Sequence, residues 1–295
     1  MTATVISGTE IAKQIRQELK HEVTLLKYKQ DLVPGLATIL IGEDPASQVY
    51  INAKVKICQE LGILSVKHVL PADINEPTLL ALIKRLNKDH KVHGILVQLP
   101  LPQHINESNV IIAIDPRKDV DSFHPVNVGK LMIGEPDFLP CTPQGIQQLL
   151  LRSGIEIEGA EVVIVGRSNI VGKPIANMLL QKKPGANATV TVCHTATRDI
   201  AAHTRRADIL IVAAGKAKAI TADMVKEGVV VIDVGVHRIG RTAEGKSILC
   251  GDVDFDSVKE KAKAITPVPG GVGPMTIAML MANTVKAAKL AAGLT

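Results

Sequence analysis

The sequence predicts an α/β protein with a mainly parallel sheet, arranged in two domains. Short runs rich in Val, Ile and Leu alternate with longer segments of helical period, as in parallel sheets covered by helices on both faces. A length of 295 residues suggests two domains of about 150 residues each. The alternation stops over residues 115–143, a stretch with little helical or strand period, and then restarts.

The first half of the chain alternates three expected strands with two expected helices. Asp44 and Pro45 form a favourable N-cap and first-turn pair, and Gly62 is a typical stop signal, so a helix is expected between them. The expected elements are strands at 36–41, 65–70 and 94–98, and helices at 45–61 and 78–89.

The second half repeats this pattern and ends in a helix. The expected elements are helices at 144–152 and 171–181, and strands at 161–165, 188–193, 209–213 and 229–234. A last helix at 276–292 follows a Pro/Gly-rich segment and has no strand of its own, so we expect it to pack on the first domain. We therefore expect one domain from residues 1–142 plus 277–295, and a second domain from residues 143–276.

Composition and charge exclude several classes of protein. The chain has 34 Lys and Arg against 29 Asp and Glu, a formal net charge of +5, and only two Tyr, three Phe and no Trp. So few rings leave little for stacking bases, and no nucleic-acid partner is expected. No apolar run approaches the roughly 18 residues of a membrane span, so no membrane association is expected. A multiply anionic small molecule suits the mild positive charge.

The four cysteines lie far apart and form no C-x-x-C or His/Cys cluster. This distribution favours reduced core thiols in a reducing compartment and predicts no metal site. The first residues lack the basic region and apolar stretch of a secretion signal. We therefore expect a cytoplasmic protein.

A glycine-containing turn marks the second domain. The expected strand at 161–165 runs into Gly166, and an expected helix begins near Gly172. Strand, glycine turn and helix in this order are typical of a Rossmann-like dinucleotide-binding domain, in which the helix N-terminus receives a pyrophosphate. Ser168 replaces the second glycine of the usual pattern, and a simple tight turn remains the alternative.

The residues near this turn favour NADP over NAD. An NAD site normally has an acidic residue at the end of the second strand, which holds the ribose 2′-hydroxyl. Here that strand is followed by His194 and Thr195, and no acidic residue occurs before Asp199. Arg167 lies in the turn itself, where its guanidinium can pair with a 2′-phosphate.

A second nucleotide pattern, at residues 240–247, is interpreted as a hairpin loop. The segment matches G-x-x-x-x-G-K-[ST], which would indicate an ATPase that depends on Lys246. However, the strand before it ends several residues too early, and Ser247 is followed by apolar residues typical of another strand. A phosphate-binding loop needs a helix at that point.

Polar side chains in the first domain form a candidate site. Ser47, Tyr50 and Lys54 are spaced i, i+3 and i+7, so they share one face of the expected helix, although a solvated face would have the same spacing. Gln98 lies at the carboxyl end of an apolar strand, where open α/β sheets place ligand groups.

Two further segments carry candidate groups. Asp119 and Asp121 alternate with apolar residues, so in an extended segment both carboxylates would face the same way; a solvated loop is the alternative. His124, next to them, is expected to form structural hydrogen bonds. The segment 269–273 is rich in glycine, which lets the backbone approach a ligand closely.

Taken together, the chain closely resembles the bifunctional methylenetetrahydrofolate dehydrogenase/methenyltetrahydrofolate cyclohydrolase family along nearly its whole length. One departure is Ser122, where the family commonly has Gly. The resemblance is carried by DPASQVYINAK at 44–54, VQLPLP at 97–102, KDVD at 118–121, PCTP at 140–143, GRSNIVGKP at 166–174, DVG at 233–235 and PGGVGPMT at 269–276.

The resemblance implies two α/β domains flanking a cleft and a homodimer formed through the NAD(P) domains. It implies oxidation of 5,10-methylenetetrahydrofolate with NADP and hydrolysis of the 5,10-methenyl product to 10-formyltetrahydrofolate, in one-carbon metabolism and purine biosynthesis. A polyglutamylated folate is the expected substrate. A folate- or nucleotide-binding module without turnover is the remaining alternative, and it would not need Lys54.

The resemblance also implies roles for individual residues. Asp121 would accept hydrogen bonds from the pterin, Tyr50 would stack on its rings, and Lys54, oriented by Gln98, would act as the base. The implied substrate-binding residues are Ser47, Tyr50, Lys54, Val97, Gln98, Leu99, Asp121, Pro269, Gly270, Gly271 and Gly273. The implied cofactor-binding residues are Gly166, Arg167, Ser168, Gly172, Thr195 and Val236.

Overall fold

The computed structural model describes residues 2–242, 245 and 247–294. The chain divides into two compact units. The six-stranded unit comprises Met1–Lys13 and Thr142–Thr276, and the three-stranded unit comprises Gln14–Cys141 and Ile277–Thr295. Each contains a parallel sheet with helices, so the predicted α/β class is confirmed.

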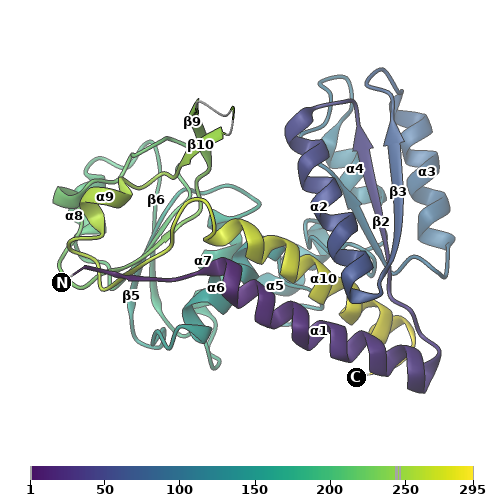
Figure 1. The fold of residues 1–295 in the computed structure, drawn as a ribbon, viewed down its shortest axis with the longest axis horizontal. Helices are drawn as coiled ribbons and strands as arrows, with labels where there is room; N and C mark the ends of the chain where they lie inside the picture. The colour runs from purple at the N-terminus through teal and green to yellow at the C-terminus, as the bar shows by residue number, and fades with distance from the viewer. Residues whose placement is uncertain (1, 243–244, 246, 295) are drawn as a thin grey trace. The chain divides into compact units, whose positions relative to one another are not determined.

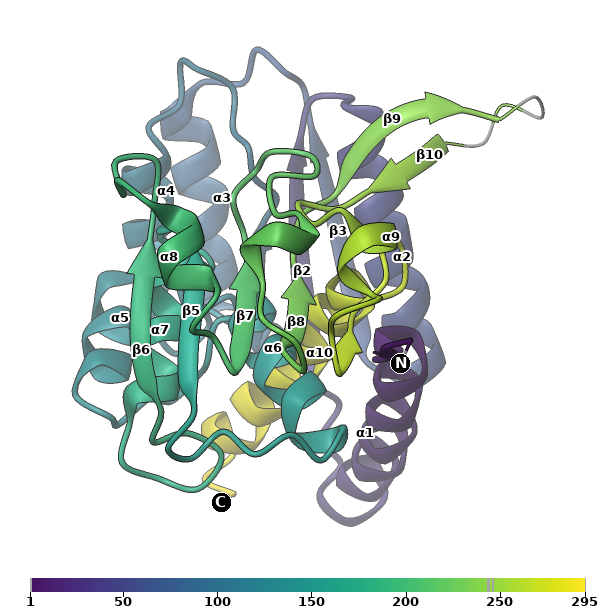
Figure 2. The same cartoon turned by 90° about the vertical axis from the view of Figure 1, so that its left-hand side faces the viewer.

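The sheet of the six-stranded unit is parallel throughout, as Figure 2 shows for its longer strands. Its strands are short and rich in Val and Ile, which suits strands buried on both faces. From one edge to the other, the order is β1 (Thr4–Val5), β11 (Ala264–Ile265), β8 (Val230–Asp233), β7 (Ile209–Val212), β5 (Glu161–Val165) and β6 (Thr189–Cys193).

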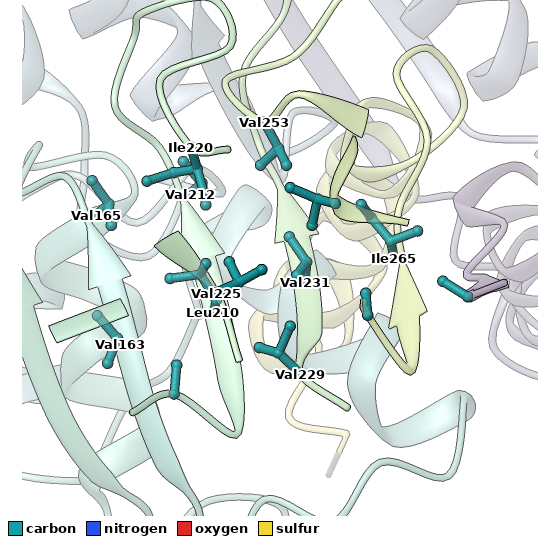
Figure 3. Close-up of a cluster of buried hydrophobic side chains, with 14 of the residues drawn as sticks. Val163, Val165, Leu210, Val212, Ile220, Val225, Val229, Val231, Val253 and Ile265 are labelled. Carbon is teal, nitrogen blue, oxygen red and sulfur yellow. The ribbon is translucent and has the colours of Figure 1, made fainter. Parts of the chain in front are cut away.

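One face of this sheet packs into a continuous apolar core. Alternate residues of neighbouring strands, such as Val163, Leu210 and Val231, lie on the same face and are fully buried (Figure 3). This is the side-chain period of two that strands impose. The core fixes the register of the strands and therefore the positions of the loops that follow them.

Helices and a hairpin complete the six-stranded unit. An antiparallel hairpin, formed by β9 (His237–Arg241) and β10 (Ser247–Cys250), extends away from the parallel strands in Figure 2. The helices are α6 (Cys141–Arg152, from its second residue onward), α7 (Gly172–Leu180), α8 (Ile200–Thr204), the short 3₁₀ turn η1 (Ala222–Met224) and α9 (Phe255–Val258).

The three-stranded unit is built around a smaller parallel sheet. Its strand order is β3 (Leu64–Leu70), β2 (Gly35–Ile41) and β4 (Gly94–Val97). In Figure 1, α2 and α3 lie on opposite sides of these strands. The helices are α2 (Pro45–Leu61), α3 (Glu76–Lys88), α4 (Glu107–Ala113) and α5 (Pro125–Met132). Leu79, Leu82, Ile83 and Leu86 of α3 pack with alternate strand residues in the core.

The N-terminal segment departs from the expected domain division. Residues 1–13 were expected in the first domain, but β1 pairs with β11 and therefore belongs to the six-stranded sheet. The helix α1 (Gly8–Gln30) follows β1 and continues into the three-stranded unit. The last helix, α10 (Val272–Ala291), likewise begins in one unit and ends in the other.

The stretch 115–143 is more regular than its sequence indicates. It contains the helix α5, whose N-cap is His124: the ring Nδ1 accepts the Val126 N–H at 3.1 Å. The expectation that His124 forms structural hydrogen bonds is confirmed. A helix of eight residues is too short to show a clear period in a sequence.

Candidate active site

The helix α2 positions three of the candidate side chains. Asp44 caps it as predicted, with its carboxylate accepting the Ser47 N–H at 2.8 Å, and Gly62 ends it in a left-handed conformation. Because the helix is continuous between these caps, Ser47, Tyr50 and Lys54 share one face. Their environments differ: Tyr50 is 43% exposed, whereas Lys54 is only 7% exposed.

Lys54 and Gln98 form a direct contact. The Lys54 Nζ donates to the Gln98 Oε1 at 2.9 Å. Gln98 directly follows β4, and its Nε2 donates to the Leu99 carbonyl at 2.8 Å, which turns the amide oxygen toward the lysine. The amide is therefore oriented by the backbone and in turn orients the amine.

Burial makes the Lys54 amine easier to deprotonate. Removal from water lowers its pKa, and the attraction of Asp121 and Cys141 offsets only part of this effect. Burial also raises the pKa of Asp121, against the opposing effect of Lys54. A lysine with a lowered pKa beside an oriented amide and a carboxyl group can accept a proton at a lower pH than an exposed lysine can.

Asp121 lies in a turn, whereas Asp119 forms an isolated parallel bridge with Ile95, so the two do not share one extended segment as expected. Asp119 accepts hydrogen bonds from the His124 N–H and the Asn127 Nδ2, both at 2.8 Å, so its carboxylate holds the start of α5. Asp119 and Asp121 both border a small pocket whose walls include Val97 and Leu99. The two acids therefore line the same pocket, and Asp119 also holds α5 through its hydrogen bonds.

Ser122 occupies a position that favours glycine. Its φ is +61°, in the left-handed region, where a side chain is strained. The side chain is fully buried, and its hydroxyl donates to the Phe138 carbonyl at 3.1 Å. This hydrogen bond helps to hold the turn that carries Asp121.

Cys141 lies close to Lys54 and Asp121 but was not among the site residues predicted from the sequence. It is buried, and burial together with Asp121 raises the pKa of its thiol. The Sγ donates to the Val120 carbonyl at 3.3 Å, so the thiol packs against the turn of Asp121. Its signal in the sequence is the PCTP segment at 140–143, which is one of the segments that carry the family resemblance.

The glycine turn of the six-stranded unit has no room for a side chain at Gly166 or Gly172. A Cβ at Gly166, whose φ is +126°, would lie 2.1 Å from the Ala213 carbonyl oxygen, and a Cβ at Gly172 would lie 2.2 Å from the Gly166 oxygen. The Ser168 hydroxyl accepts the N–H groups of Val171 at 3.1 Å and Gly172 at 3.4 Å. Arg167 beside it is exposed.

The remaining candidate cofactor residues follow the same edge of the sheet. Thr195 comes after β6 and Val236 after β8, and both are exposed. β6 lies next to β5 on one side, and β7, the following strand in the chain, lies next to β5 on the other side. The topological switch point therefore lies between β5 and β7. Open α/β sheets bind dinucleotides at such a point, outside the carboxyl ends of the strands. The tight backbone turn at Gly166 fits a dinucleotide there.

The segment 269–273 belongs to the six-stranded unit. A Cβ at Gly271 would lie 2.5 Å from the Pro267 oxygen, and the Thr9 N–H donates to the Gly270 oxygen at 3.0 Å. Gly273 lies within the first turn of α10, because this helix begins at Val272, earlier than predicted. Pro269 is exposed.

The pattern at residues 240–247 is not a phosphate-binding loop. Gly240 and Ser247 lie on the antiparallel strands β9 and β10, so the predicted hairpin is confirmed. Lys246 itself is outside the described residues. A strand begins at Ser247, where a phosphate-binding loop would require a helix.

The described part of the chain has neither a cluster of metal-ligating side chains nor a membrane-spanning helix. No three His, Cys, Asp or Glu side chains there come together as metal ligands would. In the same residues, no helix combines the length and apolar character needed to cross a membrane.

These features define a class of protein. A glycine turn at the switch point of a parallel sheet, together with a buried lysine, amide and carboxyl cluster, is typical of a dinucleotide-binding enzyme. The chain belongs to the tetrahydrofolate dehydrogenase/cyclohydrolase family: the model of the family's catalytic domain matches residues 6–121, and that of its NAD(P)-binding domain matches residues 140–292. It is therefore a bifunctional methylenetetrahydrofolate dehydrogenase and cyclohydrolase of folate one-carbon metabolism.

Individual relatives are similar to this chain over nearly their full lengths. Bifunctional protein FolD of Syntrophus aciditrophicus (strain SB) is 68% identical over 294 residues, which cover 100% of both chains. The crystal structure of FolD from Campylobacter jejuni is 51% identical, with a TM-score of 0.91 over 98% of this chain and 99% of that one. FolD of Trypanosoma brucei, solved with NADP and an inhibitor, is 41% identical, with a TM-score of 0.93 over 99% of each chain.

Proposed function

We propose that Lys54, Gln98 and Asp121 carry out the folate chemistry of this enzyme, and that its nucleotide is NADP. The observation that carries this proposal is the buried Lys54 amine held at 2.9 Å from the Gln98 amide oxygen. The substrate is 5,10-methylenetetrahydrofolate, and the products are NADPH and 10-formyltetrahydrofolate.

The first step is hydride transfer from the one-carbon bridge of the folate, for which bound NADP supplies the acceptor. The chain contributes binding and orientation. Asp121 accepts hydrogen bonds from the pterin's amino and ring N–H groups, and Tyr50 stacks on its rings. Ser47, Val97 and Leu99 border the folate. The resemblance also implies folate contacts for Pro269, Gly270, Gly271 and Gly273, which belong to the six-stranded unit.

The second step is hydrolysis of the 5,10-methenyl cation. Water adds to the one-carbon unit and gives its proton to the neutral Lys54 amine. The bond between that carbon and N5 then breaks, N5 takes up the remaining hydroxyl proton, and the formyl group stays on N10. Gln98 keeps the amine directed at the water. The methenyl carbon is already a strong electrophile, so no metal is needed.

NADP is proposed because of the charge at the glycine turn. Arg167 is exposed in this turn and can pair with a 2′-phosphate. The other proposed contacts are the backbone of Gly166, Ser168 and Gly172, and the side chains of Thr195 and Val236. Thr195 stands where an NAD-specific enzyme would normally have an acidic residue.

The oligomeric state, the cellular location and the metabolic role are also proposals. Ile239 and Ile248 are exposed on the hairpin, at 58% and 41%, and a homodimer formed through the six-stranded units would cover them. All four cysteines are free, which suits the cytoplasm. We further propose that the folate is polyglutamylated and that its product serves purine biosynthesis.

Replacing Arg167 with Ala tests the nucleotide. We expect the variant to lose roughly 10- to 150-fold in kcat/KM with NADP, the effect of one charge-assisted contact, and to change little with NAD. The assay follows the absorbance bands of reduced nicotinamide and of methenyltetrahydrofolate, starting from methylenetetrahydrofolate. The NAD reaction is the internal control. Equal losses with both nucleotides would refute the proposed specificity.

A further inference from the structure

Two buried aspartates lie at the carboxyl edge of the six-stranded sheet, and neither takes part in the proposed reaction steps. Asp233 ends β8 and is 3% exposed. Its carboxylate accepts the N–H groups of Asp252 at 2.9 Å, Val253 at 3.0 Å and Gly235 at 3.1 Å. Asp233 therefore fixes the backbone on both sides of Asp252.

Asp252 is fully buried and links two other segments. Its Oδ2 accepts the N–H groups of Ala214 at 2.7 Å and Gly215 at 3.0 Å. Its Oδ1 lies 2.7 Å from the Nε2 of His237, the first residue of β9. Because a carboxylate only accepts hydrogen bonds, the histidine ring donates its Nε2 proton.

Two glycines make room for these carboxylates. A Cβ at Gly235 would lie 2.3 Å from the Asp252 Cγ, and a Cβ at Gly251 would lie 1.8 Å from the Asp233 Oδ2. Neither glycine has a positive φ, so close contact and not backbone conformation requires glycine here. The local backbone is thus built around the two carboxylates.

The turn that Asp252 holds lies against the proposed cofactor turn. Ala213, Ala214 and Gly215 follow β7, and the Ala213 carbonyl oxygen is the atom that a Cβ at Gly166 would meet at 2.1 Å. β5 and β7 are the strands on either side of the topological switch point. Ala214 and Gly215 are exposed. Asp252 therefore holds this turn from its buried side, and the outer side of the turn is exposed to solvent.

We propose that Asp252 and His237 are positioning residues for the dinucleotide. Asp252 holds the turn 213–215 against the glycine turn, and His237 holds the Asp252 carboxylate in place. This inference rests on the proposed NADP site, and it adds that the shape of that site depends on a hydrogen bond from the hairpin strand β9. Neither residue needs to touch the nucleotide.

A pair of His237 variants tests the proposal. His237→Ala removes the ring N–H, whereas His237→Gln keeps an Nε2–H donor at the same number of bonds from the Cα. We expect the NADPH dissociation constant to rise about 10-fold in the Ala variant, the effect of one charge-assisted hydrogen bond, and to stay within about 3-fold of the wild type in the Gln variant. The fluorescence of NADPH, excited at the reduced-nicotinamide absorbance band, measures this binding.

The cyclohydrolase reaction separates positioning from damage to the fold. Measured on methenyltetrahydrofolate without nucleotide, it should be unchanged in both His237 variants, and the dehydrogenase should lose mainly in its KM for NADP. Asp252→Ala should raise the NADPH dissociation constant further, to about 100-fold, because it also frees the two turn amides. If that variant does not fold, the His237 pair alone decides.

Three results would overturn the proposal: an unchanged dissociation constant in His237→Ala, equal losses in the Ala and Gln variants, or a parallel loss of the cyclohydrolase. Failure of the proposed function itself has another signature. In that case the wild-type enzyme would bind NADPH no better than NADH, and the His237 variants would show the same lack of preference.

Discussion

The Lys54→Met enzyme should release methenyltetrahydrofolate that the wild type would hydrolyse. Hydride transfer requires no proton removal by the protein, whereas hydrolysis requires a base for the attacking water. Methionine keeps the length and apolar packing of the buried stem but has no amine. We expect the cyclohydrolase to lose about 100-fold or more, the usual scale for a general base, and the dehydrogenase to lose less. The methenyl absorbance band during turnover measures both effects.

Lys56→Met is the matched control for this substitution. Lys56 lies on the same helix but is exposed, so its loss should leave both activities near the wild-type level. If Lys54→Met hydrolysed methenyltetrahydrofolate at the wild-type rate, the proposed base would be wrong. Asp119 and His124 would then be the next residues to test.

Replacing Asp121 with Asn should impair both activities together. The amide keeps one acceptor oxygen but turns an NH₂ donor toward the donor edge of the pterin, so a charge-assisted hydrogen bond is lost and two donors face each other. We expect a cost of about 3 kcal/mol, or roughly 150-fold in kcat/KM for the folate in each reaction. Steady-state assays of the two reactions measure this loss.

Asp89→Asn is the control for Asp121. Asp89 is exposed and lies before the amino end of β4, whereas Gln98 follows the carboxyl end of this strand. Its replacement should leave the KM for the folate unchanged in both reactions. A loss confined to one of the two activities in Asp121→Asn would contradict the role of the carboxylate as a shared pterin anchor.

Elements with strong local signals could be predicted from the sequence. The helix α2 begins and ends at the predicted residues because Asp44, Pro45 and Gly62 specify its ends chemically. The pairing of β1 with β11 has no local signal, since each strand has two residues and about 260 residues of chain lie between them. The N-terminal segment was therefore assigned to the wrong unit.

The same distinction holds for the candidate site. Lys54 and Gln98 were identified because helix spacing and strand ends are visible in a sequence, and the structure joins them at 2.9 Å. The network of Asp252 and His237 was missed because its members come from three separate segments, the strand β9, the chain after β10 and the turn after β7, with no fixed spacing between them. Such a network follows from the order of the strands in the sheet.

The pH dependence of the cyclohydrolase tests the central claim, that a buried and neutral Lys54 is the base. Lysine can accept a proton only above its pKa, and burial lowers the pKa of Lys54. The enzymatic rate should therefore rise with pH through a midpoint below the ordinary lysine value, and Lys54→Met should lack this rise once the uncatalysed rate is subtracted. The same rising limb in both enzymes would contradict the account.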